Sequence, residues 1–94
     1  MRIESIIWLE EIVEKLWKKH HVREHEVEEA LENHPRFKFG EKGHRPDEHL
    51  YVALGQTASG RYLAIFFIFK ESREALVVSA RDMTPAERRR YEQR

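Results

Sequence analysis

The sequence predicts an α+β fold in which two N-terminal helices precede an antiparallel sheet of about four strands and a C-terminal helix. Three observations predict it. Apolar residues recur at three- and four-residue steps through the first third of the chain, which is the period of a helix buried on one side. Short runs of β-branched and aromatic residues, separated by turn residues, follow between Arg36 and Arg81. A helix-start signal then appears at Thr84. The 94 residues suit one domain, residues 1–94.

The first helix is expected from about Leu9 up to a break at His20–Arg23. Five apolar residues fall on one side of it, while Glu and Lys occupy the other. They are Leu9, Ile12, Val13, Leu16 and Trp17. Residues 1–8 remain ambiguous, because their pattern suits either a short strand or an earlier start of this helix.

The second helix is expected from about Glu24 to Asn33. Its buried stripe consists of Val27, Ala30 and Leu31. The helix ends before Pro35, because a residue that precedes proline disfavours helical backbone angles.

Four strands are expected after this helix, at Arg36–Phe39, Glu48–Thr57, Arg61–Lys70 and Ala75–Arg81. The third of them is apolar on both faces. This pattern is typical of a central strand that is covered on both sides, or of one whose outer face meets a partner.

The C-terminal helix has the clearest start signal of the chain. Thr84 is expected to cap it, Pro85 occupies its first position, and Glu87 completes a capping box. The capping box explains Glu87 fully, so we do not interpret this residue as catalytic.

Composition narrows the function classes. The chain has no cysteine, which excludes disulfides and thiolate metal sites. Its longest apolar run, Tyr62–Phe69, is far shorter than the roughly 20 residues that span a membrane. No signal-peptide pattern opens the sequence, so a cytoplasmic protein without membrane contact is expected. Residues 1–35 carry five Lys/Arg and nine Asp/Glu, whereas residues 36–94 carry twelve and eight. This asymmetry indicates either a basic face for a polyanion and an acidic face for another partner, or simply two acidic helices.

Two stretches resemble the BrnT family of toxins. The first is Lys19-His20-His21-Val22, followed by Glu26-Val27-Glu28-Glu29-Ala30-Leu31 and then Pro35. The second is Ser79-Ala80-Arg81-Asp82-Met83-Thr84-Pro85-Ala86-Glu87-Arg88-Arg89-Arg90-Tyr91-Glu92. Between them, His44, Glu48, Gly55 and Gly60-Arg61 fall at matching places. The sequence departs from the family pattern at Leu9, where Asp is usual, at His21, where the turn has Gly, and at His49, where Arg is frequent.

The resemblance implies a RelE/ParE-like fold and a type II toxin–antitoxin system. It implies a metal-independent endoribonuclease that needs no cofactor, cleaves RNA and blocks translation. The implied partners are the RNA substrate and a BrnA-like ribbon-helix-helix antitoxin, with operon DNA contacted only through that antitoxin. Whether the chain also forms a homodimer stays open.

RNA cleavage through the 2′-hydroxyl needs proton-transfer groups and cations, and His and Arg supply both. His20 and Arg81 are the main candidates. His20 closes a helix, where a cation is favoured, although the same position also suits a residue that only hydrogen-bonds the last carbonyls. Arg81 interrupts an apolar strand, so its charge must find a partner or solvent.

A second group of titratable residues lies in the loop around residue 45. This loop either presents them as functional residues or is simply a solvated charged loop. Glu48 and His49 would point to opposite faces if a strand began there. The candidate catalytic residues are therefore His20, Arg81, His44, Glu48 and His49. The candidate RNA-binding residues are Lys19, Arg45, Arg61, Arg90 and Tyr91. The simpler explanation of Arg61 is a solvated turn residue, and that of Tyr91 is an aromatic that packs its helix on the sheet. No metal site is expected, because the break between His21 and His25 separates the one suggestive pair.

Two other functions remain open at this point. One is a ParE-like toxin that is not a nuclease. The other is a non-catalytic module that binds protein or RNA. The His, Arg and Glu set favours a nuclease, because a toxin that only binds an enzyme needs no titratable cleft.

Overall fold

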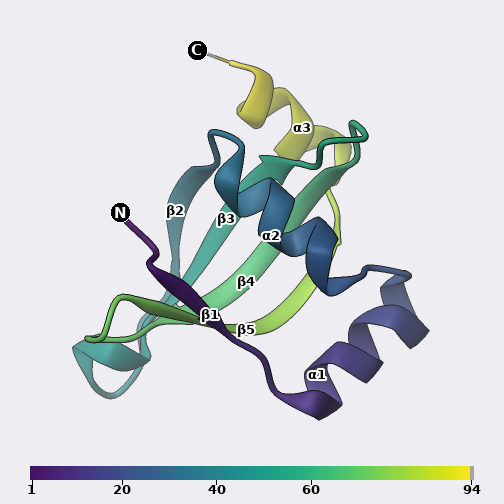
Figure 1. The fold of residues 1–94 in the computed structure, drawn as a ribbon. Coiled ribbons are helices and arrows are strands. Elements are labelled where there is room, and N and C mark those ends of the chain that lie inside the picture. Colours follow the sequence, from purple (N-terminus) through teal and green to yellow (C-terminus); the bar gives the residue numbers. More distant parts are fainter. Residues whose placement is uncertain (94) are drawn as a thin grey trace.

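The computed structural model describes residues 1–93, and its centre is a five-stranded sheet in the order β1-β5-β4-β3-β2 (Figure 1). The strands are β1 (Ser5–Ile7), β2 (Arg36–Glu41), β3 (Leu50–Gln56), β4 (Tyr62–Phe69) and β5 (Glu74–Asp82). The helices are α1 (Glu10–Lys15), its π-helical continuation η1 (Leu16–His20), α2 (Glu24–Glu32), the 3₁₀ turn η2 (Pro46–Glu48) and α3 (Pro85–Glu92).

Strand β1 corrects the expected sheet of four antiparallel strands. It precedes both N-terminal helices and pairs in parallel with the start of β5, with Ser5 opposite Glu74 and Ile7 opposite Leu76. A strand of three residues is too short for its alternation to differ from the start of a helix. Its partner is also remote in sequence, so local pattern cannot reveal the pairing. The sheet is therefore mixed.

The four remaining strands confirm the expected antiparallel order. Strands β2, β3, β4 and β5 pair each with the next. The start of β3 differs from the expectation, because Glu48 belongs to η2 and the strand begins only at Leu50. Strand β2 runs two residues further than expected, with a register shift between Phe39 and Glu41.

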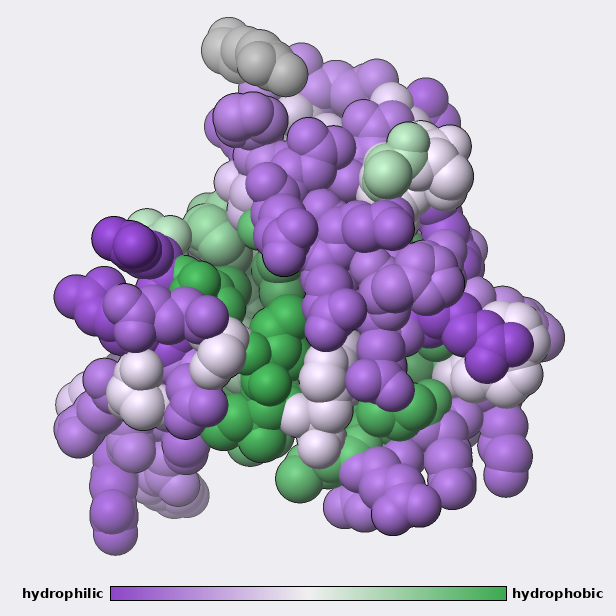
Figure 2. Space-filling view, in the orientation of Figure 1, coloured by the Kyte–Doolittle hydropathy of each residue, from purple (hydrophilic) through white to green (hydrophobic). Residues whose placement is uncertain are grey.

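One face of the sheet, which we call the helical face, is covered by η1 and α2. Ile65, Phe67 and Val77 on the strands contact Leu16 and other apolar residues of the helices in the main core. Gly55 allows this close packing, because a Cβ there would lie 2.5 Å from the carbonyl oxygen of Ala30. Figure 2 shows this face with α2 in front. Apolar residues remain visible beside the helix, surrounded by hydrophilic ones.

The opposite face, which we call the open face, is covered at one end only. There Met83 and Tyr91 pack against Leu54 and Ala64 in a smaller cluster. Phe66 also packs against this cluster, and beyond it the face carries half-buried residues such as Ile68. Strand β4 is thus the central strand that its doubly apolar pattern predicts, but its outer side is incompletely covered.

The helix ends agree well with the sequence pattern. Helix α2 stops at Glu32, and helix α3 begins with Thr84 as its N-cap, Pro85 in its first turn and a complete capping box with Glu87. The first helix differs in its last turn, which widens to the π-helix η1. π-Helical turns are rare and are frequent at functional sites. No helix among residues 1–93 has the length and apolar character that crossing a bilayer requires.

Candidate active site

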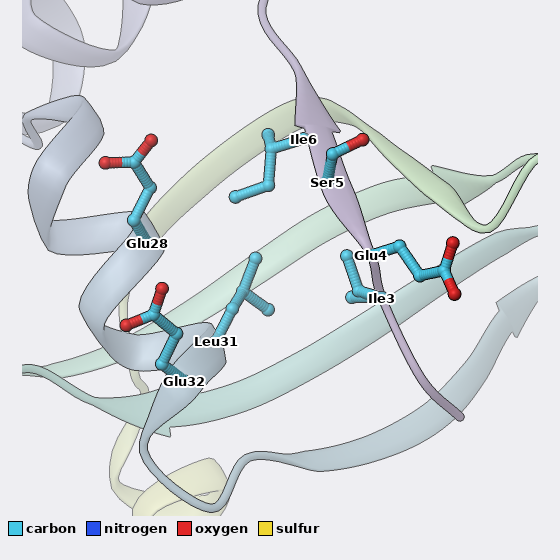
Figure 3. A pocket seen from close by; sticks show the side chains of 7 residues that line it. All are labelled: Ile3, Glu4, Ser5, Ile6, Glu28, Leu31 and Glu32. Carbon is cyan, nitrogen blue, oxygen red and sulfur yellow. The ribbon is translucent and has the colours of Figure 1, made fainter.

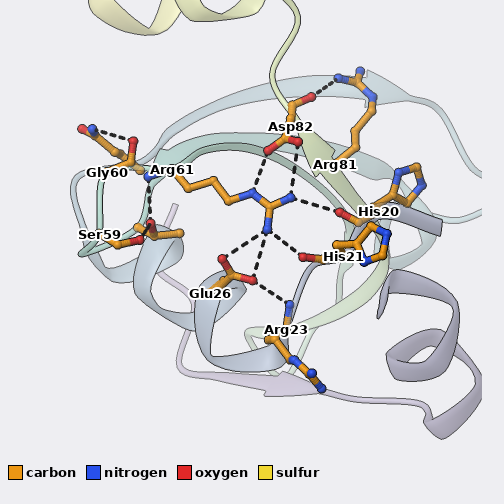
Figure 4. A network of polar contacts seen from close by, with 11 residues as sticks. His20, His21, Arg23, Glu26, Ser59, Gly60, Arg61, Arg81 and Asp82 are labelled. Carbon is orange, nitrogen blue, oxygen red and sulfur yellow. Dashed lines mark hydrogen bonds and ion pairs between the residues drawn. The ribbon is translucent and has the colours of Figure 1, made fainter. Parts of the chain in front are cut away.

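Arg61 lies just before β4, and its guanidinium joins η1, α2 and the end of β5 (Figure 4). Its Nε donates to Asp82 Oδ1 at 2.7 Å, and Nη2 donates to Asp82 Oδ2 at 3.3 Å. Nη1 lies 3.2 Å from each carboxylate oxygen of Glu26. The carbonyl oxygens of His21 and His20 accept from Nη1 at 2.8 Å and from Nη2 at 3.0 Å. All five N–H donors of Arg61 therefore have acceptors within the protein.

The charges of this network stabilise one another. The hydrogen bond from Arg61 lowers the pKa of Asp82 against the opposing effect of burial. Burial raises the pKa of Glu26, but the hydrogen bonds from the Arg23 amide and from Arg61 outweigh it, so the net shift is downward. Both carboxylates stay ionised at neutral pH. Arg61 is thus a residue that holds three elements together.

Arg81 occupies the next position along the chain from Asp82 but faces the open side of the sheet. Its Nη1 and Nη2 bind the two carboxylate oxygens of Glu87 at 2.7 and 3.0 Å, and Nη1 also donates to the carbonyl oxygen of Asp82 at 3.1 Å. Its guanidinium carbon lies 5.0 Å from the ring centre of Phe66. The side chain keeps 34% of its surface exposed, so a ligand can reach it.

The Arg81–Glu87 pair should make stability depend on pH. The hydrogen bond from Arg81 and the backbone amide of Thr84 lower the pKa of Glu87 to about 2, although burial opposes them. A lowered folded-state pKa gives stability that is present above the unfolded value and is lost as the pH falls through the folded value. We expect Glu87→Gln to cost on the order of 2 kcal/mol at pH 7, and this cost to vanish between about pH 4.3 and pH 2.

Urea unfolding of both proteins at a series of pH values checks this expectation. Glu92→Gln serves as the control, because Glu92 also pairs with an arginine, Arg88, but more than half of each side chain is exposed. The control should cost little at any pH. A cost of Glu87→Gln that stays constant down to pH 2 would contradict the argument.

His20 is the last residue of η1 and lies at the edge of β5, next to Asp82. Electrostatic attraction between His20 and Asp82 contributes to the lowered pKa of that carboxyl group. Figure 4 shows the imidazole of His20 and the side chain of Arg81 on the same side of the network. Lys19 precedes His20 and is exposed. The structure therefore places His20 and Arg61 beside the carboxylate of Asp82, while Arg81 donates to the carbonyl oxygen of the same residue.

The loop between β2 and β3 lies at the opposite end of the sheet. Leu50, the first residue of β3, pairs with Ile68, whereas Arg61 adjoins the far ends of β3 and β4. The seven residues of β3 separate the two ends by about 20 Å. Four candidate residues belong to this distant loop: His44, Arg45, Glu48 and His49. They do not share one phosphate with His20 and Arg81.

Within this loop, the side chains have different surroundings. His44, Arg45 and Glu48 are exposed. His49 is half-buried, and its Nδ1 accepts a hydrogen bond from the Gly43 amide at 3.0 Å. His49 thus helps to hold the loop in shape.

The two candidate residues on α3 also have different surroundings. Tyr91 packs edge-on against Tyr62, with ring centres 6.0 Å apart, and joins the smaller core cluster. Arg90 is exposed, and its carbonyl oxygen accepts from Arg36. Tyr91 therefore attaches α3 to the sheet.

Sequence reasoning assigned no role in the site to the three carboxylates that organise it, Glu26, Asp82 and Glu87. Asp82 adjoins Arg81 in sequence, but its partner is Arg61. The capping box predicted at Glu87 is confirmed, but it does not explain this residue fully, because the same carboxylate also binds Arg81. Only the fold brings these charges together. Among residues 1–93, no three His, Asp or Glu side chains form a group arranged to hold a metal ion.

Comparison with known families decides what kind of protein carries this site. Residues 8–87 match the model of a family described as the ribonuclease toxin BrnT of type II toxin–antitoxin systems. The chain belongs to the BrnT family. A search of curated proteins found no match to it. As a BrnT protein it is a ribonuclease toxin, and membership in a type II system implies an antitoxin partner and an RNA substrate.

The matched residues of this BrnT chain include His20, Arg61, Arg81 and Glu87, but not β1. The structure also shows what the departure from the BrnT pattern requires at the turn after η1. His21 stands where the family pattern has Gly, and it adopts the left-handed conformation, with a φ of 52°. Gly takes this conformation without steric cost, whereas other residues pay for it. Here the ring of His21 packs edge-on against Trp17 at 5.1 Å.

Proposed function

We propose that this BrnT protein cleaves RNA by attack of the 2′-hydroxyl on the adjacent phosphate, without a metal ion. The observation that supports the proposal is that His20 lies near the carboxylate of Asp82, while Arg81, the residue before it in the chain, donates to the Asp82 carbonyl oxygen. In the proposed step the 2′-oxygen forms a bond to phosphorus and the bond to the 5′-oxygen breaks. The products are a 2′,3′-cyclic phosphate and a 5′-hydroxyl.

His20 and Arg81 have separate roles in this step. The imidazole of His20 gives a proton to the leaving 5′-oxygen, while the proton of the 2′-hydroxyl passes to water; imidazole suits this transfer near neutral pH. Arg81 supplies two parallel N–H donors for the charge of the phosphorane, as it now does for Glu87. Arg61 acts through others, since it fixes Asp82 and the backbone of His20.

The open face offers a path for the RNA on either side of the cleaved bond. Arg81 on β5 and Lys38 on β2 lie at opposite sides of the open face, with the half-buried ring of Phe66 between them. Lys19 adds a positive charge beside His20. His44 and Arg45, at the far end of the sheet, would contact nucleotides about 20 Å from the cleaved phosphate. Cationic side chains and an aromatic ring are the usual means of binding single-stranded RNA.

We further propose that cleavage blocks translation and that a BrnA-like ribbon-helix-helix antitoxin neutralises the toxin. Operon DNA would then be bound only through the antitoxin. The toxin half is expected to carry the cleavage chemistry alone.

The experiment that tests the proposed cleavage uses purified protein, a defined RNA and an excess of chelator. We expect cleavage to continue and to leave 5′-hydroxyl and 2′,3′-cyclic phosphate ends. His20→Ala should lower the rate by about 10²–10⁴-fold and remove the limb of the pH–rate profile that an essential acid produces. His25→Ala, which changes an exposed histidine of α2, is the matched control.

Three outcomes contradict parts of the proposal. Loss of cleavage in chelator would contradict the metal-independent reaction. An unchanged pH profile in His20→Ala would exclude His20 as the acid. Growth arrest by a folded wild-type protein that leaves RNA intact would favour a toxin that is not a nuclease.

A further inference from the structure

An apolar groove lies on the helical face between α2 and the N-terminal segment that contains β1 (Figure 3). Its volume is about 310 Å³. The apolar side chains come from both sides, Ile3 and Ile6 from the N-terminal segment and Leu31 from α2. All three pack against the main core, so the groove has a firm apolar floor. A cavity of this size holds one or two large apolar side chains.

The rim of this groove is acidic. Glu28 and Glu32 border it on α2, and Glu4 borders it on the other side, where Figure 3 shows its carboxylate apart from those of the helix. All three side chains are exposed. None of the ion pairs formed among residues 1–93 involves them. Glu28 and Glu32 stand four residues apart, and like charges at that spacing destabilise a helix. The free protein therefore bears a repulsion that a cationic ligand would relieve.

We propose that this groove binds a basic amphipathic segment of the antitoxin, with an apolar side chain inserted between Ile6 and Leu31 and Lys or Arg side chains against the three carboxylates. The inference rests on the proposed function for the existence of that partner. RNA is excluded by charge, because its phosphates would meet only glutamates at the rim.

The C-terminal helix of a second copy is not a suitable occupant of the groove. Its basic helix is α3, and the one large apolar residue there, Tyr91, is packed against Tyr62 and the sheet. The exposed residues of α3 are arginines and small or polar residues. A helix without an outward apolar side chain cannot fill the groove, so α3 of a second copy is excluded as the occupant.

The groove is separate from the candidate active site. It lies between α2 and β1, whereas Arg81 points to the open face. Binding there attaches the antitoxin without using residues that act on RNA. Neutralisation and cleavage should therefore respond to different substitutions.

The test measures affinity for the purified antitoxin encoded beside the toxin gene, by calorimetry, together with RNA cleavage. Glu28→Lys with Glu32→Lys should raise the Kd roughly tenfold or more, leave RNA cleavage unchanged, and produce a toxin that the antitoxin no longer neutralises in cells. Glu10→Lys with Glu14→Lys is the matched control, since it changes two exposed glutamates four apart on α1 and alters the net charge equally. The control should bind like wild type.

A second variant guards against simple misfolding. Glu28→Gln with Glu32→Gln removes the repulsion, so it should melt at a higher temperature than wild type and yet bind the antitoxin more weakly. If both double lysine variants weaken antitoxin binding equally, or if neither weakens it, the groove is not the docking site. Wild-type self-association that Glu28→Lys with Glu32→Lys abolishes would overturn the proposal as well. In those cases the proposed RNA cleavage, and its loss in Arg81→Ala, would be unaffected. If the wild-type protein binds no antitoxin at all, the proposed partner is refuted as well.

Discussion

Replacing Arg61 with methionine is expected to lower the free energy of unfolding by about 2–3 kcal/mol, the largest stability effect of any single surface substitution in this protein. The substitution keeps much of the side chain's apolar stem and removes every donor of the guanidinium. Glu26 and Asp82 would lose their shared counter-ion, and the carbonyl oxygens of His20 and His21 would lose their hydrogen bonds. Thermal unfolding should shift by roughly 10–20 °C, because a domain of this size moves about 4–8 °C per kcal/mol.

Two variants make this expectation specific to the network. Arg61→Lys keeps the charge but cannot reach four acceptors in fixed directions, so it should recover only part of the loss. Arg89→Met changes an exposed arginine of α3 and should alter stability by less than about 0.5 kcal/mol. If Arg61→Met melts with wild type, the network contributes nothing measurable, and the position of His20 must be fixed by other contacts.

Replacing Arg81 with alanine should give, with His20→Ala, one of the two largest effects on activity. We expect RNA cleavage to fall by about 10²–10³-fold, the usual consequence of removing a donor that stabilises transition-state charge. Stability should fall much less, by about 1–2 kcal/mol, because the Thr84 amide continues to hydrogen-bond Glu87. Single-turnover cleavage of a defined RNA, with folding checked by circular dichroism, measures both quantities.

Arg88→Ala is the control for Arg81→Ala. Arg88 also combines a carboxylate partner with an aromatic ring, since it pairs with Glu92 at 3.6 Å and lies 4.0 Å from the ring centre of Tyr62. It belongs to α3, outside the group of His20 and Arg61, and its loss should leave cleavage within a few-fold of wild type. Equal losses in both variants would point to general electrostatic attraction of RNA rather than to a role at the reacting phosphate.

Much of the fold could be predicted from the sequence, because its signals are local. The spacing of Val27, Ala30 and Leu31 indicates α2, and Thr84 with Glu87 marks the start of α3. The alternation of the later strands gives an antiparallel order that the structure confirms. Strand β1 was left open between a short strand and the start of the first helix, because three residues carry too little pattern, and its pairing could not be predicted because the partner lies near the other end of the chain.

The site was predictable only in part, for the same physical reason. His20 was selected from its place at a helix end together with the family resemblance, and Arg81 because its charge interrupts an apolar strand. For Arg61 a solvated turn residue was the simpler expectation, and only tertiary packing gives it Glu26 and Asp82 as partners. The loop around His44 is rich in titratable residues, yet the register of β3 with β4 carries it to the other end of the sheet. Residue type alone does not reveal such distances.

The pairing of β1 with β5 also determines when the toxin can fold. Ser5 and Glu74, whose side chains are hydrogen-bonded, are 69 positions apart in the chain. Joining such distant segments carries a high loop-closure cost and slows folding. Ribosomes add about 5–20 residues per second, so β1 and the helices wait several seconds for their partner strand to be made. The nascent chain thus acquires its active shape late, with the same strand that delivers Arg81.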